Sequence, residues 1–372
     1  MTGTGARNIR LDFRESASVA ARRQSAFSPG KLPRQALEGL LRYRGASDHR
    51  VVHGPGFGRD AAVIDLGERL LVLKSDPVTF VGEEAGWYAV HVNANDVAVL
   101  GCVPAWFQAT VLLPPGSDMA IARKVMREAN HALRELGIAL TGGHTEVTPA
   151  VTQPVVAGDM QGVMRKDELV TASGARLGDL LVCTKTAGIE GTAILARTFA
   201  REAQKALGGV AARRAARFHR RPGISIVSEA LLAARNGVTA MHDPTEGGVR
   251  AGLAELAFAS GRALEVDLDR IPVAPETAAL CRHFGVDPLG LIGSGMLLAT
   301  VPPEHWPTVQ AAWERAGIRG ECIGRVTTGR GVRARANGKR VPWHWSERDE
   351  LARLLAEREL HAKRSRKLRI LG

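Results

Sequence analysis

Residues 87–101 read Trp-Tyr-Ala-Val-His-Val-Asn-Ala-Asn-Asp-Val-Ala-Val-Leu-Gly, and the first half of the chain is arranged around them. Asn93 and Asp96 share one face of the helix predicted here, beside its apolar stripe. Burying either side chain without a polar partner costs on the order of 1–3 kcal/mol, so we expect a polar group, such as a cation with attached phosphates, to meet that face. A broken helix with a solvated turn at 93–96 is the alternative. The stripe consists of Val90, Ala94, Val97, Ala98 and Gly101, which recur at helical spacing.

The flanking segments predict a compact first unit over residues 31–165. A glycine loop at 54–60 precedes a strand, which excludes a Walker A loop or a dinucleotide fingerprint, because those loops open a helix. The segment 137–140 leads into Gly142-Gly143-His144-Thr145-Glu146. The expected order is β-β-α-β-α-β-β after a short amphipathic helix at 33–44. Four of its five strands fall at 61–64, 70–76, 105–113 and 152–164, and its second helix at 118–136.

A second unit, of α/β character, is expected over residues 166–345. Its strands are predicted at 180–185, 238–241, 264–268, 296–301, near 318–326 and at 332–342. Its helices are predicted at 190–219, 224–236, 249–260, 274–284 and 304–316. Residues 1–30 are interpreted as a flexible basic leader, and residues 346–372 as an isolated helix at 346–360 followed by a basic tail. The sequence therefore predicts an α+β protein of two domains.

The charge of the chain is strongly basic, with a formal net charge of +12 over 372 residues, but the excess is peripheral. It lies in residues 1–50, 201–222 and 347–372, while the remainder is slightly acidic. No aromatic residues alternate with these basic runs as a stacking platform for nucleic acid would require. We therefore interpret them as solvated flanks and do not expect a nucleic acid partner, although weak adhesion to an acidic protein or to RNA stays open.

Localisation signals and cysteine spacing favour a cytoplasmic protein. No apolar run approaches the roughly 18–20 residues that span a bilayer, and the first 30 residues lack the apolar core of a secretory signal. The four cysteines lie far apart, at Cys102, Cys183, Cys281 and Cys322, without metal-type or redox-type pairing. We expect reduced thiols.

Four carboxylates carry the candidate chemistry of the first unit, and each lies beside a glycine or near the end of a predicted element. Mg²⁺ prefers oxygen ligands and bridges carboxylates to phosphates, so acids on several loops suit one or more Mg²⁺ ions holding a nucleoside triphosphate. Taken one at a time, each acid can instead be a solvated surface group or a helix cap. The four are Asp60, Asp76, Asp96 and Glu146, with Asn93 near one of them.

A second candidate is the run His242-Asp243-Pro244-Thr245-Glu246-Gly247-Gly248, which precedes a predicted helix. A helix N-terminus after a glycine loop can bind an anion through its backbone N–H groups. Capping of the helix by Thr245 or Asp243 is the alternative, and both can hold together. A zinc site at His144 and His242 is not favoured, since no ligand spacing supports it.

These motifs, in this order, resemble the superfamily of aminoimidazole ribonucleotide synthetase, thiamine-monophosphate kinase, selenophosphate synthetase and the hydrogenase-maturation carbamoyl dehydratase. The resemblance covers nearly all of residues 31–342. The matching runs are Gly58–Val63, Ser75-Asp76-Pro77, Asn93–Val97, Gly142–Glu146, Thr184-Lys185 with Gly188–Ala196, His242–Gly248 and Ser294–Leu298.

The resemblance implies an N-terminal ferredoxin-like domain whose strands form half of a barrel completed across a homodimer, with ATP bound near that interface. It implies transfer of a phosphoryl group from ATP to an oxygen of a second substrate. Asp60, Asp76, Asp96 and Glu146 become candidate Mg²⁺ ligands. Asp76, Asp96 and Asp243 become candidate catalytic residues. The implied nucleotide-binding residues are Gly58, Asp60, Asn93, Gly142, Gly143, Thr145, Thr245 and Gly247.

Within this superfamily the loop at 243–248 looks most like the carbamoyl dehydratase. That enzyme modifies a cysteine at its own C-terminus, whereas this chain has no cysteine after Cys322, so we do not expect thiocarbamate chemistry in cis. His144 stands where the dehydratase pattern has an acid. The resemblance thus implies an ATP- and Mg²⁺-dependent enzyme that activates a carbonyl, carboxamide or thiocarbamate oxygen of a small-molecule or protein-borne acceptor. A non-catalytic nucleotide-binding assembly partner is the alternative.

Overall fold

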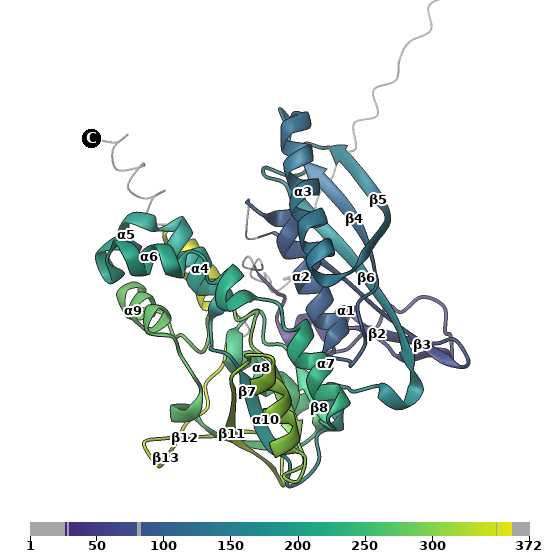
Figure 1. Ribbon diagram of the computed structural model, residues 1–372, viewed down its shortest axis with the longest axis vertical. Helices are drawn as coiled ribbons and strands as arrows, with labels where there is room; N and C mark the ends of the chain where they lie inside the picture. Colours follow the sequence, from purple (N-terminus) through teal and green to yellow (C-terminus); the bar gives the residue numbers. More distant parts are fainter. Residues whose placement is uncertain (1–26, 28–29, 80–82, 347, 359–372) are drawn as a thin grey trace, which may run out of the picture.

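The computed structural model describes residues 27, 30–79, 83–346 and 348–358. The expected basic tail and nearly all of the expected leader therefore lie outside the described residues. The described chain forms two domains, each built on one sheet, and the N-terminal sheet stands beside the C-terminal domain (Figure 1). No helix in these ranges is long and apolar enough to span a membrane. The predicted two-domain fold with mixed helices and strands is confirmed.

The N-terminal sheet has the strand order β1-β2-β3-β6-β4-β5 and is antiparallel except for the parallel pair β4 and β5. The predicted β-β-α-β-α-β-β order is confirmed, with a further short strand, β1, ahead of it. The strands are β1 (Val51–His53), β2 (Ala62–Asp65), β3 (Arg69–Val78), β4 (Trp106–Leu113), β5 (Ala139–Val147) and β6 (Val155–Arg165), and the helices are α1 (Arg34–Leu40), α2 (Ala85–Ala98) and α3 (Met119–Leu136). Contrary to the expected amphipathic helix, α1 has no buried residue.

Helix α2 is the predicted helix of the opening stretch, and every residue of it except Val92 is buried. It lies between the sheet, the helix α3 and the second domain, so both of its sides face protein. Asn95 fixes the second domain to it: the amide Oδ1 accepts from the backbone N–H of Ile226 at 2.9 Å, and Nδ2 donates to the carbonyl of Ile224 at 2.8 Å. The Asn-Ala-Asn-Asp run is thus a packed helical segment and not a solvated turn.

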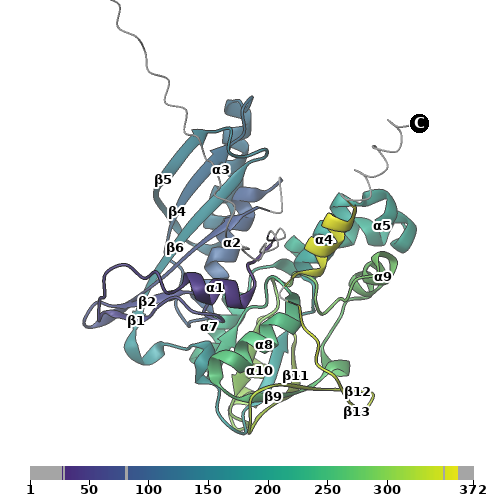
Figure 2. The same ribbon diagram turned by 180° about the vertical axis from the view of Figure 1, so that it is seen from behind.

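Strand β5 is the outer edge of the N-terminal sheet, on the side away from the C-terminal domain (Figures 1 and 2). All nine of its residues are exposed. The run 142–146, which was expected to lie in a connection, belongs to this strand, because β4, α3 and β5 form one parallel crossover unit. Apolar side chains on the same sheet are exposed as well, among them Trp106, Leu140 and Val163.

The C-terminal sheet has the order β13-β12-β9-β11-β7-β10-β8. Its strands are β7 (Leu180–Thr184), β8 (Ala240–His242), β9 (Ala263–Asp267), β10 (Leu298–Val301), β11 (Gly320–Thr327), β12 (Gly331–Ala336) and β13 (Lys339–Val341). The helices are α4 (Ile189–Thr198), α5 (Ala200–Leu207), α6 (Gly209–Ala215), α7 (Val227–Arg235), α8 (Gly248–Ser260), α9 (Pro275–Phe284) and α10 (Trp306–Arg315), with a π-helical turn η3 at His219–Gly223. Short 3₁₀ turns occupy Lys166–Glu168, Ala172–Gly174 and Leu268–Arg270.

Two predicted elements of this domain differ in the structure. The helical stretch at 190–219 is divided into α4, α5 and α6, since the backbone leaves the helical region at Phe199 and Gly208. The strand at 332–342 is the hairpin of β12 and β13, turned at 337–338.

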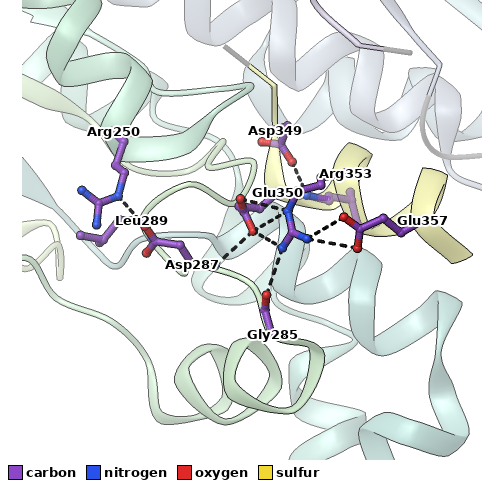
Figure 3. Close-up of polar contacts among 9 residues, drawn as sticks. Arg250, Gly285, Asp287, Leu289, Asp349, Glu350, Arg353 and Glu357 are labelled. Atoms are coloured by element: carbon purple, nitrogen blue, oxygen red, sulfur yellow. Dashed lines mark hydrogen bonds and ion pairs between the residues drawn. The ribbon is translucent and has the colours of Figure 1, made fainter. Parts of the chain in front are cut away.

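The C-terminal helix, at 350–358, is not isolated, because Leu351 and Leu354 pack into the core that α4 and α9 share. Arg353 holds this helix in place (Figure 3): its guanidinium group donates to Glu350 at 2.7 Å, to Glu357 at 2.9 Å and to the carbonyl of Gly285 at 3.0 Å.

Candidate active site between the two domains

A cavity of about 390 Å³ lies between the two domains and collects most of the predicted acidic residues. The N-terminal domain contributes the loop at 56–60, strand β3 and helix α2 to its walls, and the C-terminal domain contributes α4, the loop after β8 and α8. The lining residues include Gly58, Asp60, Lys74, Asp76, Asp96, Glu190, His242, Thr245 and Glu255.

Lys74 and Asp76 reach the cavity from β3, where they point to the same side because they are two residues apart. The ammonium group of Lys74 lies 2.8 Å from a carboxylate oxygen of Asp96 on α2 and 3.3 Å from one of Asp76. Burial of Lys74 lowers its pKa, but the carboxylates of Asp96 and Asp76 raise it by more than burial lowers it. The pKa of Lys74 therefore lies above its usual value, and the group stays charged. A fixed cation therefore stands among the acids.

Asn93 holds this arrangement together from beneath. Its Oδ1 accepts from the backbone N–H of Asp76 at 2.8 Å, and its Nδ2 donates to the carbonyls of Asp76 at 3.1 Å and Ala89 at 2.8 Å. The side chain is fully buried and both amide protons are used. The polar group that meets this face of α2 is thus the backbone of β3, and Asn93 positions Asp76 instead of facing the cavity.

His242 links the two domains through carboxylates. One ring nitrogen, Nδ1, lies 2.9 Å from Asp60, and the other, Nε2, lies 2.9 Å from Glu255 on α8. Burial lowers the pKa of His242, but the contact with Asp60 and then that with Glu255 raise it well above its ordinary value. The ring is therefore an imidazolium that donates to both acids, and neither nitrogen is available to a zinc ion.

Asp243 is the residue whose surroundings most need a ligand. It is 2% exposed, and neither of its carboxylate oxygens has a hydrogen-bond partner among the described residues. Burial, and then the charge of Asp60, raise its pKa to about 6. Asp96 is similar, because burial raises its pKa well above the usual range and Asp243 adds to the effect, while Lys74 opposes it.

The cluster fits a hard divalent cation. Oxygen atoms of Asp60 and Asp243 lie within 4.8 Å of each other, and Asp243 has two oxygens free to coordinate. Mg²⁺ takes oxygen ligands of this kind and keeps waters for a substrate phosphate. A bound cation would also offset the negative charge that gathers where Asp60 and Asp243 lie close together.

Gly58 and Thr245 lie in the cavity wall as well. Gly58 has φ +71°, and a Cβ there would come within 3.0 Å of the carbonyl of Glu255, so the loop at 56–60 passes close to α8. The backbone N–H of Gly247, expected to face an anion, instead donates to Asp349 at 2.8 Å, and that of Gly248 donates to the carbonyl of Thr245 at 3.0 Å. These two amides serve the loop itself.

The structure does not bring the predicted residues of β5 into this cavity. Gly142, Gly143, Thr145 and Glu146 are exposed on the edge strand, where Glu146 contacts only His144, at 3.1 Å, among the described ion pairs. Packing explains the glycine at position 143: its φ is +146°, and a Cβ there would lie 2.1 Å from the carbonyl oxygen of Ala109 on β4. Within one chain, Glu146 is therefore not a ligand of the acid cluster.

Four lining residues were not identified from the sequence as part of the acidic site: Lys74, Glu190, Glu255 and, in its bridging role, His242. The sequence could have identified Lys74, because it lies two residues before Asp76 on one predicted strand and therefore points to the same side. Glu190 and Glu255 lie on helices with few polar neighbours. Burial raises the pKa of Glu190 to about 7, and its Oε2 has no partner among the described residues. The sequence feature that could have identified Glu190 and Glu255 is an acidic residue within an otherwise apolar helix.

Both halves of the chain match one family. Residues 58–164 match the N-terminal domain of AIR synthase related protein, and residues 176–337 match its C-terminal domain. The boundary between the two matches falls between β6 and β7, where the structure divides into its two sheets.

Individual relatives agree with this match. The carbamoyl dehydratase HypE of Escherichia coli is 30% identical over 264 residues, which cover 69% of this chain and 75% of that protein. A crystal structure of the hydrogenase maturation protein HypE in complex with ATP superposes with a TM-score of 0.65 at 23% identity, over 84% of this chain and 91% of the other. The structure of AaThiL complexed with AMPPCP and TMP has a TM-score of 0.65 at 22% identity, over 84% of this chain and 94% of the other.

Proposed function

This chain belongs to the AIR synthase related family, and from that premise we propose that it is an ATP- and Mg²⁺-dependent enzyme that phosphorylates a carbonyl-type oxygen. The acceptor oxygen would belong to a carboxamide, thiocarbamate or related carbonyl group, so that the phosphate leaves in a following dehydration. One observation carries the proposal: the buried carboxylate of Asp243 has no hydrogen-bond partner among the described residues and lies beside Asp60, which lines a cavity together with Asp96 and Lys74.

The relatives support the class of reaction. A dehydratase acting on a carbamoyl group removes an oxygen, and a phosphoryl group turns that oxygen into a better leaving group. The E. coli relative carries the name carbamoyl dehydratase, and a structural neighbour was solved with ATP.

The residues of the cavity have distinct roles in this proposal. Asp60, Asp76, Asp96 and Asp243 would hold Mg²⁺, which offsets the charge of the phosphates when bound. The ammonium group of Lys74 has a fixed position in the cavity, because Asp76 and Asp96 contact it on two sides. His242 orients Asp60, because its Nδ1 lies 2.9 Å from a carboxylate oxygen of Asp60.

We infer that the protein is a homodimer that pairs through the exposed face containing β5. The exposed Trp106, Leu140 and Val163 on that sheet favour coverage by another surface. Glu146 and the glycines of β5 could join a nucleotide site only from such an interface. Light scattering on the wild-type protein and on Leu140→Glu tests this inference, with a dimer and a monomer as the expected results; a monomeric wild-type protein contradicts it.

The functional proposal is tested by ATP binding and turnover in the presence of Mg²⁺. Asp76→Ala and Asp96→Ala should each reduce ATP turnover by about 100-fold or more, the range for losing a group that holds transition-state charge. Asp167→Asn is the control, because Asp167 is exposed and pairs with Arg165 on the surface. Equal turnover in all four proteins contradicts the proposal. Nucleotide binding without any turnover would instead favour the non-catalytic assembly partner.

A further inference from the structure

A second cavity has a volume of about 850 Å³, and six of its nine lining residues are arginines. It lies where α4, α6 and the π-turn η3 of the C-terminal domain face the start of α2. A single acidic residue, Glu84, is among its lining residues. The arginines are Arg197, Arg213, Arg214, Arg217, Arg220 and Arg221, and the buried ring of His219 completes the wall. The basic run at 201–222 therefore contributes to a cavity and is not only a solvated flank.

Three of these arginines are held in fixed positions. Arg197 and Arg220 donate to the two carboxylate oxygens of Glu84 at 2.7 Å and 2.6 Å, and the guanidinium group of Arg220 stacks 4.0 Å from the centre of the Trp87 ring. Arg214 pairs with Glu276. Guanidinium groups fixed in this way lose little freedom when an anion binds between them.

Glu84 is itself committed to this arrangement. Its carboxylate also lies 2.8 Å from Nε2 of His219, and the pKa of Glu84 is held well below its usual range by His219 first and by the arginines after it. Glu84 has φ +60°, which is uncommon for a residue with a side chain. One strained glutamate thus orients two arginines and a histidine toward the same cavity.

The other three arginines carry uncompensated charge. Arg213, Arg217 and Arg221 are exposed, and no ion pair joins any of them to an acidic residue within the described ranges. Nδ1 of the buried His219 ring likewise has no hydrogen-bond partner there. The positive charge gathered at this cavity attracts anions.

The arginine cavity is close to the acidic one, because both contact the same helix. Glu190, in the first turn of α4, lines the acidic cavity, and Arg197, near its end, lines the arginine cavity. Arg197 is seven positions after Glu190 along the helix, which is about 10 Å at 1.5 Å per residue. A molecule of modest size could place one end in each cavity.

We propose that the arginine cavity binds the phosphate group of a phosphorylated small molecule, which is the acceptor of the reaction. The assignment as acceptor rests on the proposed function, whereas the phosphate site stands on the cavity alone. Phosphate suits several guanidinium forks, since it offers oxygens for paired hydrogen bonds together with more than one negative charge. The volume of the cavity is within the range of small-molecule sites, about 300–1,000 Å³.

The test uses the full chain and isothermal titration with inorganic pyrophosphate in EDTA, so that no divalent ion can bring the probe to the acidic cavity. We expect the double variant Arg213→Gln/Arg217→Gln to bind about tenfold more weakly or worse, the effect of losing charged hydrogen bonds. Arg335→Gln is the matched control on the exposed strand β12 and should bind like the wild type. Melting temperatures equal to the wild type are expected for both variants, because the substituted side chains are exposed. Equal affinity in all three proteins overturns the phosphate site.

Two further arms separate the alternatives. Asp96→Asn should lose binding of ATP with Mg²⁺ and keep binding of pyrophosphate in EDTA; if ATP does not bind even to the wild type, the proposed function fails and the phosphate site remains. Ribose 5-phosphate should compete with pyrophosphate in the wild-type protein. A deca-glutamate peptide or an RNA oligonucleotide that binds at least tenfold more tightly than pyrophosphate would overturn the assignment to a small molecule.

Discussion

Asp243→Asn should stabilise the ligand-free protein while it removes nucleotide binding. The carboxylate of Asp243 is buried without a donor among the described residues, and its pKa is raised from 3.8 to about 6. Because the folded pKa is above the unfolded one, the protonated form favours folding, and this contribution is lost as the pH rises from about 4 through 6. A shift of about two pH units corresponds to about 3 kcal/mol at pH 8.

The assay is urea denaturation of the wild type and of Asp243→Asn at pH 4.5 and pH 8, in EDTA and without nucleotide. The free energy of unfolding of the variant should exceed that of the wild type by up to about 3 kcal/mol at pH 8, and the two should converge at the lower pH. Asp167→Asn, on the surface, should show no such gain. A variant that is destabilised at pH 8, or a difference that does not depend on pH, would refute the reasoning.

Three further substitutions test the fold and the loop next to the cavity. Asn95→Ala should lower the free energy of unfolding by about 2–4 kcal/mol, because two buried backbone groups lose their partners; urea denaturation checks this, with Asn236→Ala, which loses one local bond, as the milder control. Gly143→Ala should cost about 2 kcal/mol or more, since its Cβ would overlap the neighbouring strand, whereas Gly142→Ala, with open space around its Cβ, should leave the melting temperature unchanged. Burial raises the pKa of Asp349 to about 7, so the free energy of unfolding of the wild type should fall as the pH rises from about 4 to 7. The free energy of unfolding of Asp349→Ala should depend less on pH over this range. Identical pH dependence in the two proteins would contradict this prediction.

The sequence was sufficient to predict most of the N-terminal domain. The periodic apolar pattern from Val90 to Gly101 reports burial on one side of a helix, and the helix is where that pattern places it. The pattern could not report that the opposite side of α2 is buried as well, because the partner segment at 224–226 lies more than a hundred residues away. The alternative of a solvated turn at 93–96 stayed open for this reason, although Asn95 joins the two domains in the structure.

The acidic site was predictable in part, since Asp60, Asp76 and Asp96 line one cavity and Asp243 lies beside Asp60. Residue type alone could not separate a ligand from a support. Asn93 has the chemistry of either role, and only the position of the β3 backbone decides that it holds Asp76 in place. The β5 residues resemble ligands by motif, but the parallel pairing with β4 carries them to the outer edge of the sheet.

The proposed function depends most on a divalent cation bound by the aspartates between the two domains. Crystals grown with Mn²⁺ and a non-hydrolysable ATP analogue locate that ion directly through its anomalous scattering. We predict a peak in coordination distance of Asp96 or Asp243 and of the analogue's phosphates. An ordered analogue whose phosphates and Mn²⁺ lie away from both carboxylates would contradict the account.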